Sequence, residues 1–269
     1  MEPEKVPEIL KSKINFKVFA LIIAGSIAFQ TFIYFAAEFP DFNIEENLAF
    51  VSMSLPLIVS VVSFFIAHRY GLSQVFGKSY LFLALAFFCF FLAEVTYYVY
   101  DEILGIEPYP SVADIFFFAL YPLTSLHIIT NLRFFKSKTN TLQKLPFIII
   151  PIIFFSAYTF IASDVYGGIE GIFSNDEDTF DYFYGLIFVA AATIPLSLAA
   201  FVVIIFRGGI LGVIWALLLV GILINNIGDV WYYYLELFEG YDLYHPVNLF
   251  WYTSNVIMIY ALYKHSRAI

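Results

Sequence analysis

Residues 209–235 read GILGVIWALLLVGILINNIGDVWYYYL, a long apolar run whose one charged residue is Asp229. A helix needs about 20 predominantly apolar residues to cross the roughly 30 Å hydrocarbon core of a bilayer. This run is long enough. It is therefore predicted to form a membrane-spanning helix that holds a carboxyl group inside the membrane.

Seven further stretches have the same character, so the sequence predicts eight membrane-spanning helices. The other stretches are residues 17–37, 47–67, 79–101, 112–133, 145–164, 181–206 and 246–264. Composition agrees: 61% of the residues are apolar, 13% are charged, and the mean hydropathy is +0.84, whereas a soluble domain carries about 25% charged residues. The predicted fold class is all-α, a polytopic membrane protein with one membrane domain over residues 1–269.

Charged residues between the predicted helices are segregated by sign. With eight helices, all 13 basic residues fall on one side of the membrane, and short loops rich in Lys and Arg stay in the cytoplasm. We therefore expect a protein of the cell membrane with both termini in the cytoplasm and an acidic outer face. The basic side contains Lys5, Lys11, Lys13, Lys17, Arg69, Lys78, Arg133, Lys136, Lys138, Lys144, Arg207, Lys264 and Arg267, and the outer side contains Glu38, Asp41, Glu45, Glu46, Asp101, Glu102, Glu107, Asp114, Asp164, Glu170, Asp176, Glu177, Asp178, Asp181, Glu236, Glu239 and Asp242.

The charge balance also restricts the partners. A formal net charge of −9 argues against nucleic acid, which requires clustered Lys and Arg. An acidic outer face concentrates cations and repels anions. The expected partners are the lipid bilayer, another membrane protein or a separate signalling protein, and a small neutral or cationic ligand.

One sequence pattern occurs twice. The two copies are Glu94, Val95, Tyr97, Tyr98, Asp101, Gly105 and Glu107, and then Asp229, Val230, Tyr232, Tyr233, Glu236, Gly240 and Asp242. Pro56 and Pro195 lie in the middle of the corresponding preceding spans. The sequence thus predicts two parallel four-helix repeats, about residues 15–137 and 144–266, related by an axis along the membrane normal.

Each copy places an acid and its aromatic neighbours on one helical face, because the spacing is i, i+3, i+4 and i+7. Each acid lies about 10 Å below the outer surface at 1.5 Å per residue. Spans three and seven are expected to face each other across an outward-facing cleft between the repeats. The candidate ligand-binding residues of this cleft are Glu94, Tyr97, Tyr98, Asp229, Tyr232, Tyr233, Asn225 and Asn226.

Two interpretations of the acids remain open at this stage. A carboxyl group in hydrocarbon is costly, and no span contains Lys or Arg inside its ends to pair with it, so each acid is expected to be protonated or hydrogen-bonded to tyrosine. The acids form either a ligand, cation or proton site, or a polar clamp between helices. Tyr109, Tyr244 and His245 are expected either to rim the cleft or to serve as ordinary interfacial aromatics.

The sequence predicts no cofactor, no metal site and no catalytic residue. His127 is the one histidine inside a span and is read as a core histidine rather than a ligand, as is Gln30. Ser111 and Asp114 have the spacing of a capping box. The segment Ser174–Asp178 lacks the ligand spacing of a calcium loop, so we interpret it as solvated charge.

The repeated core resembles a known type of region. Its residues are Ala93-Glu94-Val95-x-Tyr97-Tyr98, Gly105, Pro108-Tyr109-Pro110-Ser111-x-Ala113-Asp114-x-Phe116 and Tyr121-Pro122, followed by Gly228-Asp229-Val230-Trp231-Tyr232. This pattern is similar to a multi-span membrane region found in front of diguanylate-cyclase and phosphodiesterase domains in bacterial signalling proteins. The resemblance implies a membrane sensory or ligand-binding role. This chain ends soon after Lys264 without such an output domain, so a signal would pass to a separate partner.

Together these features predict a non-enzymatic sensory or ligand-binding protein, or an accessory subunit, with an outward-facing cleft lined by Glu94 and Asp229. The alternative is a proton- or cation-coupled transporter that uses the same acidic pair. An intramembrane hydrolase is disfavoured because the sequence supplies no nucleophile or metal set for it.

Overall fold

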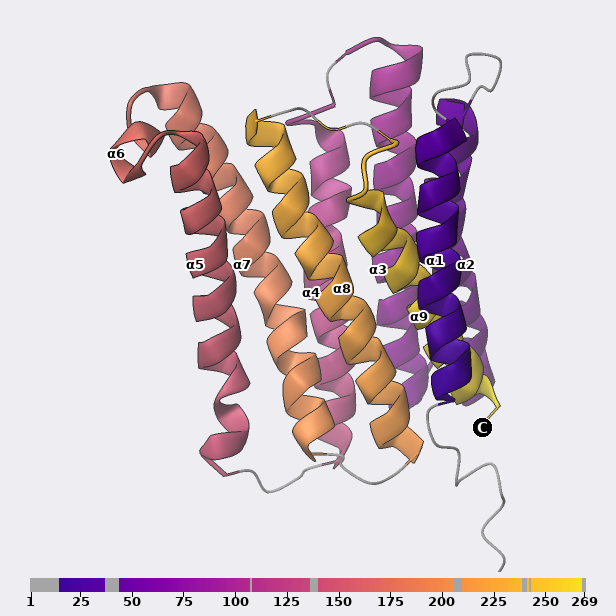
Figure 1. Cartoon of the computed structure of the whole chain (residues 1–269). Helices are drawn as coiled ribbons and strands as arrows, with labels where there is room; N and C mark the ends of the chain where they lie inside the picture. Colours follow the sequence, from indigo (N-terminus) through magenta and orange to yellow (C-terminus); the bar gives the residue numbers. More distant parts are fainter. Residues whose placement is uncertain are drawn as a thin grey trace, which may run out of the picture.

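A computed structural model of the chain describes residues 15–36, 44–106, 108–135, 140–205, 210–238, 241 and 243–267, and these residues form an all-helical structure (Figure 1). The predicted all-α class is confirmed for this part of the chain. The α-helices are α1 Phe16–Ala36, α2 Ile44–Tyr70, α3 Val75–Tyr98, α4 Val112–Phe135, α5 Pro146–Val165, α6 Ile169–Ile172, α7 Asp176–Ile205, α8 Ile210–Phe238 and α9 Asn248–Ser266. A π-helical turn, Val99–Ile103, extends α3, and a 3₁₀ turn, Leu142–Lys144, precedes α5.

Seven helical segments in the described residues are long and apolar enough to cross a membrane. They are Phe16–Ala36, Asn47–Tyr70, Val75–Ile103, Val112–Phe134, Leu142–Val165, Asp176–Ile205 and Gly212–Tyr233. The predicted multi-pass membrane character is therefore supported. The helical form suits this solvent because every backbone polar group inside a helix finds its partner within the segment.

The eighth predicted stretch, residues 246–264, is also a helix, α9, but it is not one of the seven apolar segments. The reason lies in its position. It packs against α8, α2 and α1, so most of its side chains meet protein rather than lipid. Its buried polar residues include Asn248, Thr253, Ser254 and Asn255.

Six of the helices form a closed ring. In order around it, α2 packs against α3, α3 against α4, α4 against α7, α7 against α8, α8 against α9, and α9 against α2. The main apolar core runs through these contacts, with fully buried side chains such as Val59, Leu83, Ile128 and Leu217. Helices α3 and α8 therefore lie on opposite sides of the ring.

Helices α1 and α5 lie outside this ring, at opposite edges of the view in Figure 1. Helix α1 packs on α9, and α5 packs on α7 and α8. Both expose large apolar side chains, including Leu21 and Phe32 on α1 and Ile152 and Phe160 on α5. These exposed surfaces are compatible with contact to lipid tails.

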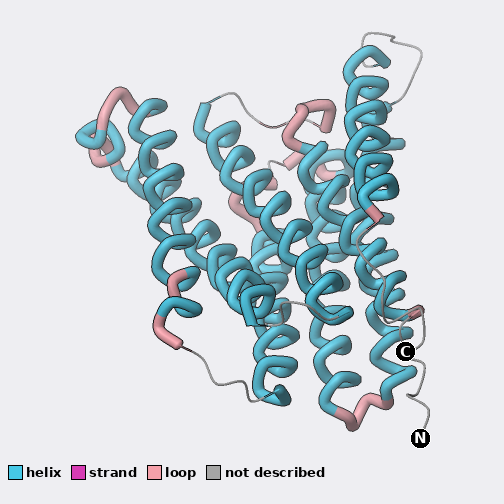
Figure 2. Tube along the Cα trace, turned by 60° about the horizontal axis from the view of Figure 1, so that its bottom comes forward, coloured by secondary structure: helices cyan, strands magenta, loops and turns pink. Residues whose placement is uncertain are grey.

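The helices alternate in direction, so that the described loops lie at two ends of the bundle (Figure 2). At one end, the Arg69 side chain donates a hydrogen bond to the backbone oxygen of Ser266 (3.0 Å), which joins the ends of α2 and α9. At the other end, Gln30 of α1 donates to the backbone oxygen of Tyr244 (2.9 Å). The described basic residues that flank the helices, such as Lys78, Arg133 and Lys144, lie at the first of these ends.

Several residues used for the sequence predictions lie outside the described part of the chain. They are Lys5, Lys11, Lys13, Glu38, Asp41, Glu107, Lys136, Lys138, Arg207, Glu239, Gly240 and Asp242.

Candidate functional site

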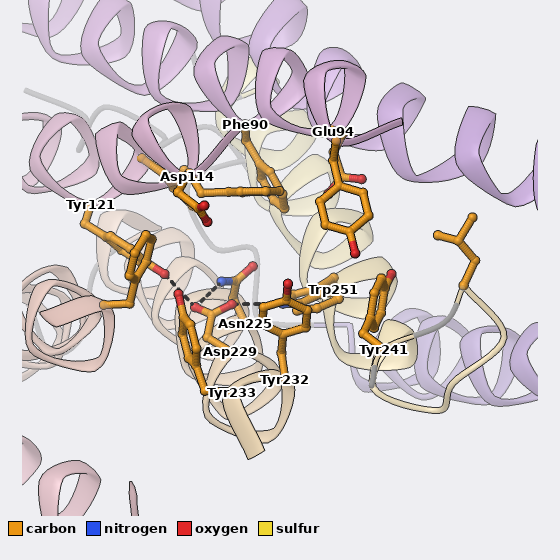
Figure 3. A pocket seen from close by; sticks show the side chains of 15 residues that line it. Phe90, Glu94, Asp114, Tyr121, Asn225, Asp229, Tyr232, Tyr233, Tyr241 and Trp251 are labelled. Carbon is orange, nitrogen blue, oxygen red and sulfur yellow. Dashed lines mark hydrogen bonds between the residues drawn. The ribbon is translucent and has the colours of Figure 1, made fainter. Parts of the chain in front are cut away.

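A cavity of about 70 Å³ lies within the ring, between α3 and α8 (Figure 3). Such a volume accommodates several water molecules, since one needs about 10–15 Å³. The walls come from α3, α4, α7, α8, the segment before α9, and α9 itself. The lining residues are Phe90, Glu94, Tyr97, Asp114, Phe117, Leu120, Tyr121, Phe188, Asn225, Asp229, Tyr232, Tyr233, Tyr241, Leu243 and Trp251.

The Asp229 carboxyl group is held by three hydrogen-bond donors from three helices. Tyr121 of α4 and Asn225 of α8 donate to Oδ2 at 3.1 and 2.9 Å, and the Trp251 indole of α9 donates to Oδ1 at 2.9 Å. All three donors are neutral. The carboxyl group therefore has a fixed orientation without a cationic partner.

Gly228 allows α9 to approach α8 closely. This close approach lets the Trp251 indole donate its hydrogen bond to the Asp229 carboxyl group. A Cβ atom at Gly228 would lie 2.9 Å from Phe250 Cβ and 3.0 Å from Trp251 Nε1. Small residues at helix interfaces in membranes permit such close packing. The glycine next to Asp229 thus helps to build the site.

We expect Gly228→Ala to lower the free energy of unfolding by about 1–3 kcal/mol, because the added methyl group overpacks the interface between α8 and α9. Reversible unfolding in detergent measures this change. Gly25→Ala is the matched control, since a Cβ atom at Gly25 meets nothing within 4 Å. Equal destabilisation by both substitutions would contradict the assignment.

Two further carboxyl groups face the cavity. Glu94 of α3 lies opposite Asp229, and the Ser52 hydroxyl of α2 is a hydrogen-bonding neighbour of its carboxyl group. Asp114 of α4 accepts a hydrogen bond from the backbone N–H of Ser111 (2.6 Å), while Ser111 Oγ accepts from the N–H of Ala113 (3.1 Å). The expected capping box therefore exists, and the same aspartate also lines the cavity.

Four aromatic rings form one wall of the cavity, here called the aromatic box: Tyr97, Tyr232, Tyr241 and Trp251. Ring centroids of Tyr232 and Tyr241 are 5.2 Å apart, those of Tyr232 and Trp251 5.7 Å, and those of Tyr97 and Tyr241 6.0 Å. Edge-on and tilted contacts of this kind fix the positions of aromatic rings. The box combines rings from α3, α8, α9 and the segment between α8 and α9.

Asn248 holds Tyr241 in this box. The Tyr241 hydroxyl donates to Asn248 Oδ1 (2.8 Å), and the Asn248 amide donates to the backbone oxygen of Leu243 (3.1 Å). Burial, with smaller contributions from Tyr252 and Glu94, raises the pKa of Tyr241 well above its ordinary value. The phenol is therefore a hydrogen-bond donor at neutral pH.

Of the eight predicted ligand-binding residues, six line the cavity and two do not. Glu94, Tyr97, Asn225, Asp229, Tyr232 and Tyr233 are part of the lining. Tyr98 instead packs near Phe50 of α2, with centroids 6.5 Å apart. The Asn226 amide donates to the backbone oxygen of Ala192 (2.9 Å) in α7, close to the break in the hydrogen-bond ladder that Pro195 causes.

The residues expected at the rim do not line the cavity either. Tyr109 packs against Tyr184 (5.4 Å between centroids), and His245 packs against Trp231 (5.4 Å). Tyr244 packs at the small apolar cluster formed by α1, α2 and α9. Asp101 is exposed in the π-helical turn that follows Tyr98, because the wider turn interrupts the i, i+3, i+4 register of α3.

Other sequence interpretations have mixed outcomes. His127 is buried and bonded through Nδ1, but its Nε2 atom has no partner in the described residues. The Gln30 amide donates to the backbone oxygen of Tyr244, while its Oε1 atom also has no partner in the described residues.

In the acidic segment Ser174–Asp178, the N–H of Asp178 donates to Asn175 Oδ1 (2.8 Å), so this exposed segment caps α7. The described residues contain no group of three or more His, Cys, Asp or Glu side chains suited to a metal ion.

Nine of the fifteen lining residues were not among the predicted site residues, and the polar or hydrogen-bonding ones of these are Asp114, Tyr121, Tyr241 and Trp251. The position of Tyr121 along its helix could have identified it, because it lies at the same level of the bundle as Asp229. It lies nine residues from Val112, the first residue of α4, and Asp229 lies nine residues from Phe238, the last residue of α8, so both are about 13 Å from the same end of the bundle. Trp251 has no such signal, because the segment before α9 descends into the bundle (Figure 1).

Comparisons with known proteins do not assign this site. No family model, no curated protein and no solved structure matches the chain.

Proposed function

We propose that the chain is a non-enzymatic membrane protein that binds a small organic cation in the cavity between α3 and α8. The observation that carries this proposal is the combination of three carboxyl groups with the aromatic box in a cavity whose lining contains no cationic side chain. The carboxyl groups are those of Glu94, Asp114 and Asp229. A cation would supply the positive charge that this lining lacks.

The aromatic box favours an ammonium group that carries alkyl substituents. Faces of Tyr and Trp rings attract cations, and boxes of such rings recognise quaternary ammonium ligands. A bare metal cation is less suitable, because hard cations prefer several converging oxygen ligands. The acidic residues around the outer helix ends further concentrate cations near the cavity.

The proposed topology places this cavity in the outer half of the membrane. Here α9 is the eighth span, since its buried polar face explains its lower hydropathy, and the basic end of the bundle faces the cytoplasm. The cavity residues then come from the acidic, outer half of the helices. A ligand would enter from outside the cell.

The ring of helices supports the proposed repeats. In the proposed repeats, α2, α3 and α4 correspond to α7, α8 and α9. If these helices are exchanged, the contact between α4 and α7 becomes the contact between α9 and α2, and the structure contains both contacts. The exchange also maps Glu94 onto Asp229. Helices α1 and α5 depart from this symmetry because α1 packs on α9, whereas α5 packs on α7 and α8.

A sensory use of the site fits the resemblance noted for the sequence. A ligand that contacts both halves of the ring, through Glu94 and Asp229, would change how these halves pack. In this proposal a separate membrane or signalling protein reads that change. A proton- or cation-coupled transporter that uses the same acidic pair remains the second proposal.

Titration calorimetry of the purified protein in detergent tests the proposed site, with tetramethylammonium as the probe and uncharged tert-butanol as the control probe. We expect tetramethylammonium to bind and tert-butanol not to bind. Glu94→Gln should weaken binding by about tenfold, which corresponds to about 1.4 kcal/mol, because a neutral amide replaces a carboxyl group that faces the ligand.

Asp101→Asn is the matched control for charge removal on the same segment, since Asp101 is exposed beyond the cavity. It should leave the affinity unchanged. Absence of tetramethylammonium binding, or equal losses in Glu94→Gln and Asp101→Asn, would overturn the assignment of the cavity as a cation site.

A further inference from the structure

A groove of about 600 Å³ lies on the outside of the helical ring, between α5 and α8. This volume is in the range of roughly 300–1,000 Å³ that is usual for pockets of small molecules. Among the described residues, the groove shares none with the lining of the cavity between α3 and α8. The residues that line the groove are Ile153, Phe154, Ala157, Phe160, Ile161 and Asp164 of α5 and Leu223, Ile227, Val230 and Trp231 of α8.

The groove exists because specific contacts fix α5 to α7. The Tyr158 hydroxyl of α5 donates to the backbone oxygen of Tyr182 (3.2 Å), and Thr159 Oγ1 is 3.0 Å from the Tyr182 hydroxyl. Gly185 of α7 leaves room for the Tyr158 ring, since a Cβ atom at Gly185 would overlap with the Tyr158 hydroxyl. The face of α5 that carries Ala157 is thus left beside α8, with a space between the two helices.

The groove has the length and the surface of a site for one acyl chain. Its α5 wall runs over eleven residues, from Ile153 to Asp164, or about 16 Å along the helix. This is about half of the roughly 30 Å hydrocarbon core, which is the depth of one leaflet. Apart from Asp164, all the lining residues are apolar or aromatic. Phe160 and Ile227 are exposed, so no other described part of the chain covers the groove.

Asp164 gives the groove a negative end. It is the one charged residue in the lining and is followed by Val165, the last residue of α5. Helices α5, α7 and α8 contain no Lys or Arg, whereas further acids follow Asp164 in the sequence. An anionic headgroup would be repelled here, while an ammonium group would pair with the carboxylate. The acids that follow are Glu170, Asp176, Glu177, Asp178 and Asp181.

Trp231 supplies a hydrogen-bond donor to the groove. Its ring packs edge-on against His245 and Phe250, with centroids 5.4 and 5.6 Å apart. The indole N–H forms no hydrogen bond with another described residue. Tryptophan side chains of membrane proteins lie at the level of the lipid headgroups, so this N–H is available to a phosphate oxygen.

We propose that the groove between α5 and α8 binds one phospholipid whose headgroup carries an ammonium group. An acyl chain lies along the apolar wall, the ammonium group pairs with Asp164, and the phosphate accepts a hydrogen bond from Trp231. Phosphatidylethanolamine has this chemistry. The site is independent of the cation cavity, and it rests on the proposed function only for its topology, which makes the bound lipid one of the outer leaflet.

Competition between two lipids, read by native mass spectrometry, tests the groove. The purified protein in detergent is mixed with equimolar dioleoyl phosphatidylethanolamine and dioleoyl phosphatidylglycerol, which have the same chains and different headgroups. We expect the wild type to retain one lipid and to prefer phosphatidylethanolamine by about threefold, the scale of an exposed ion pair.

Ala157→Trp tests the place of the acyl chain. The indole would fill the middle of the α5 wall, so the retained lipid should fall by about tenfold through the loss of apolar contact. Ala28→Trp is the matched control. Ala28 is also exposed, and it lies twelve residues into α1, as Ala157 lies eleven residues into α5. It should leave lipid retention unchanged.

Asp164→Asn tests the headgroup. It should abolish the preference for phosphatidylethanolamine, because the ammonium group loses its carboxylate. Glu170→Gln removes an exposed acid outside the groove and should keep the preference. Asp164 is exposed, and exposed substitutions usually change stability little, so this test holds even if Ala157→Trp does not fold.

Three results would overturn the lipid site. They are equal retention of the two lipids by the wild type, lipid retention that Ala157→Trp leaves unchanged, and a lipid-free dimer that Ala157→Trp dissociates. The last result would identify a second copy of the chain as the occupant.

Tetramethylammonium calorimetry on the same preparations distinguishes the two proposals. Tetramethylammonium binding without a lipid preference overturns the lipid site alone. A lipid preference that depends on Asp164, in a protein that does not bind tetramethylammonium, overturns the cation site alone.

Discussion

Replacement of Asp229 by leucine is expected to lower the free energy of unfolding by about 3 kcal/mol. The physical reason is that leucine has no carboxyl group to accept the hydrogen bonds donated by Tyr121, Asn225 and Trp251. Each buried donor left without a partner costs about 1–3 kcal/mol. The cavity moderates the total, because water can reach some of the freed groups. Reversible unfolding in detergent measures the change.

Glu94→Leu is the informative comparison for this prediction. Its carboxyl group has the Ser52 hydroxyl as a hydrogen-bonding neighbour, so its loss should cost only about 1 kcal/mol, the usual contribution of one hydrogen bond. Exposed Asp101→Leu serves as a further control. Equal losses at Asp229 and Glu94 would contradict this asymmetry and would favour a polar clamp formed by both.

The asymmetry also separates two roles that the sequence leaves together. Asp229 joins α4, α8 and α9, so it has a structural part as well as a proposed binding part. Glu94 contributes little to the contacts between helices, so its substitution is the better probe of ligand binding. A stability loss at Asp229 together with an affinity loss at Glu94 is the result that the geometry predicts.

The positions of the long helices could be predicted closely from the sequence. A bilayer fixes the minimum length and the apolar character of a span, so the helix over 209–235 was expected and α8 covers Ile210–Phe238. Helix α9 shows the limit of this reasoning. Its buried Asn248, Thr253 and Asn255 reflect contact with protein, which hydropathy alone does not reveal.

The residues of the site were harder to predict. The spacing of residues defines one face of a helix, but it does not show which side chains of that face point toward the cavity and which pack against a neighbouring helix. Consecutive residues differ by about 100° around a helix. Tyr97 and Tyr98 both flank Glu94, yet only Tyr97 lines the cavity. The same holds for Asn225 and Asn226. The direction in which each helix packs decides between such neighbours, and this depends on tertiary contacts.

The pair Tyr97 and Tyr98 also provides the sharpest test of the aromatic box. Tyr97→Leu is expected to weaken tetramethylammonium binding by about thirtyfold, the equivalent of a desolvated cation–π contact of about 2 kcal/mol. Tyr98→Leu, a change of the same type one residue away, should leave the affinity unchanged, because Tyr98 lies against Phe50. Calorimetry with the same probe measures both variants.

Tyr97→Phe distinguishes the ring from its hydroxyl. It keeps the aromatic face toward the ligand and the contact with Tyr241 (6.0 Å), so the affinity should stay within about threefold of the wild type, or about 0.7 kcal/mol. If Tyr97→Phe and Tyr97→Leu weaken binding equally, the hydroxyl rather than the ring face recognises the ligand. Recognition would then rest on hydrogen bonding, and a neutral polar ligand would fit the cavity better than an alkylated ammonium ion.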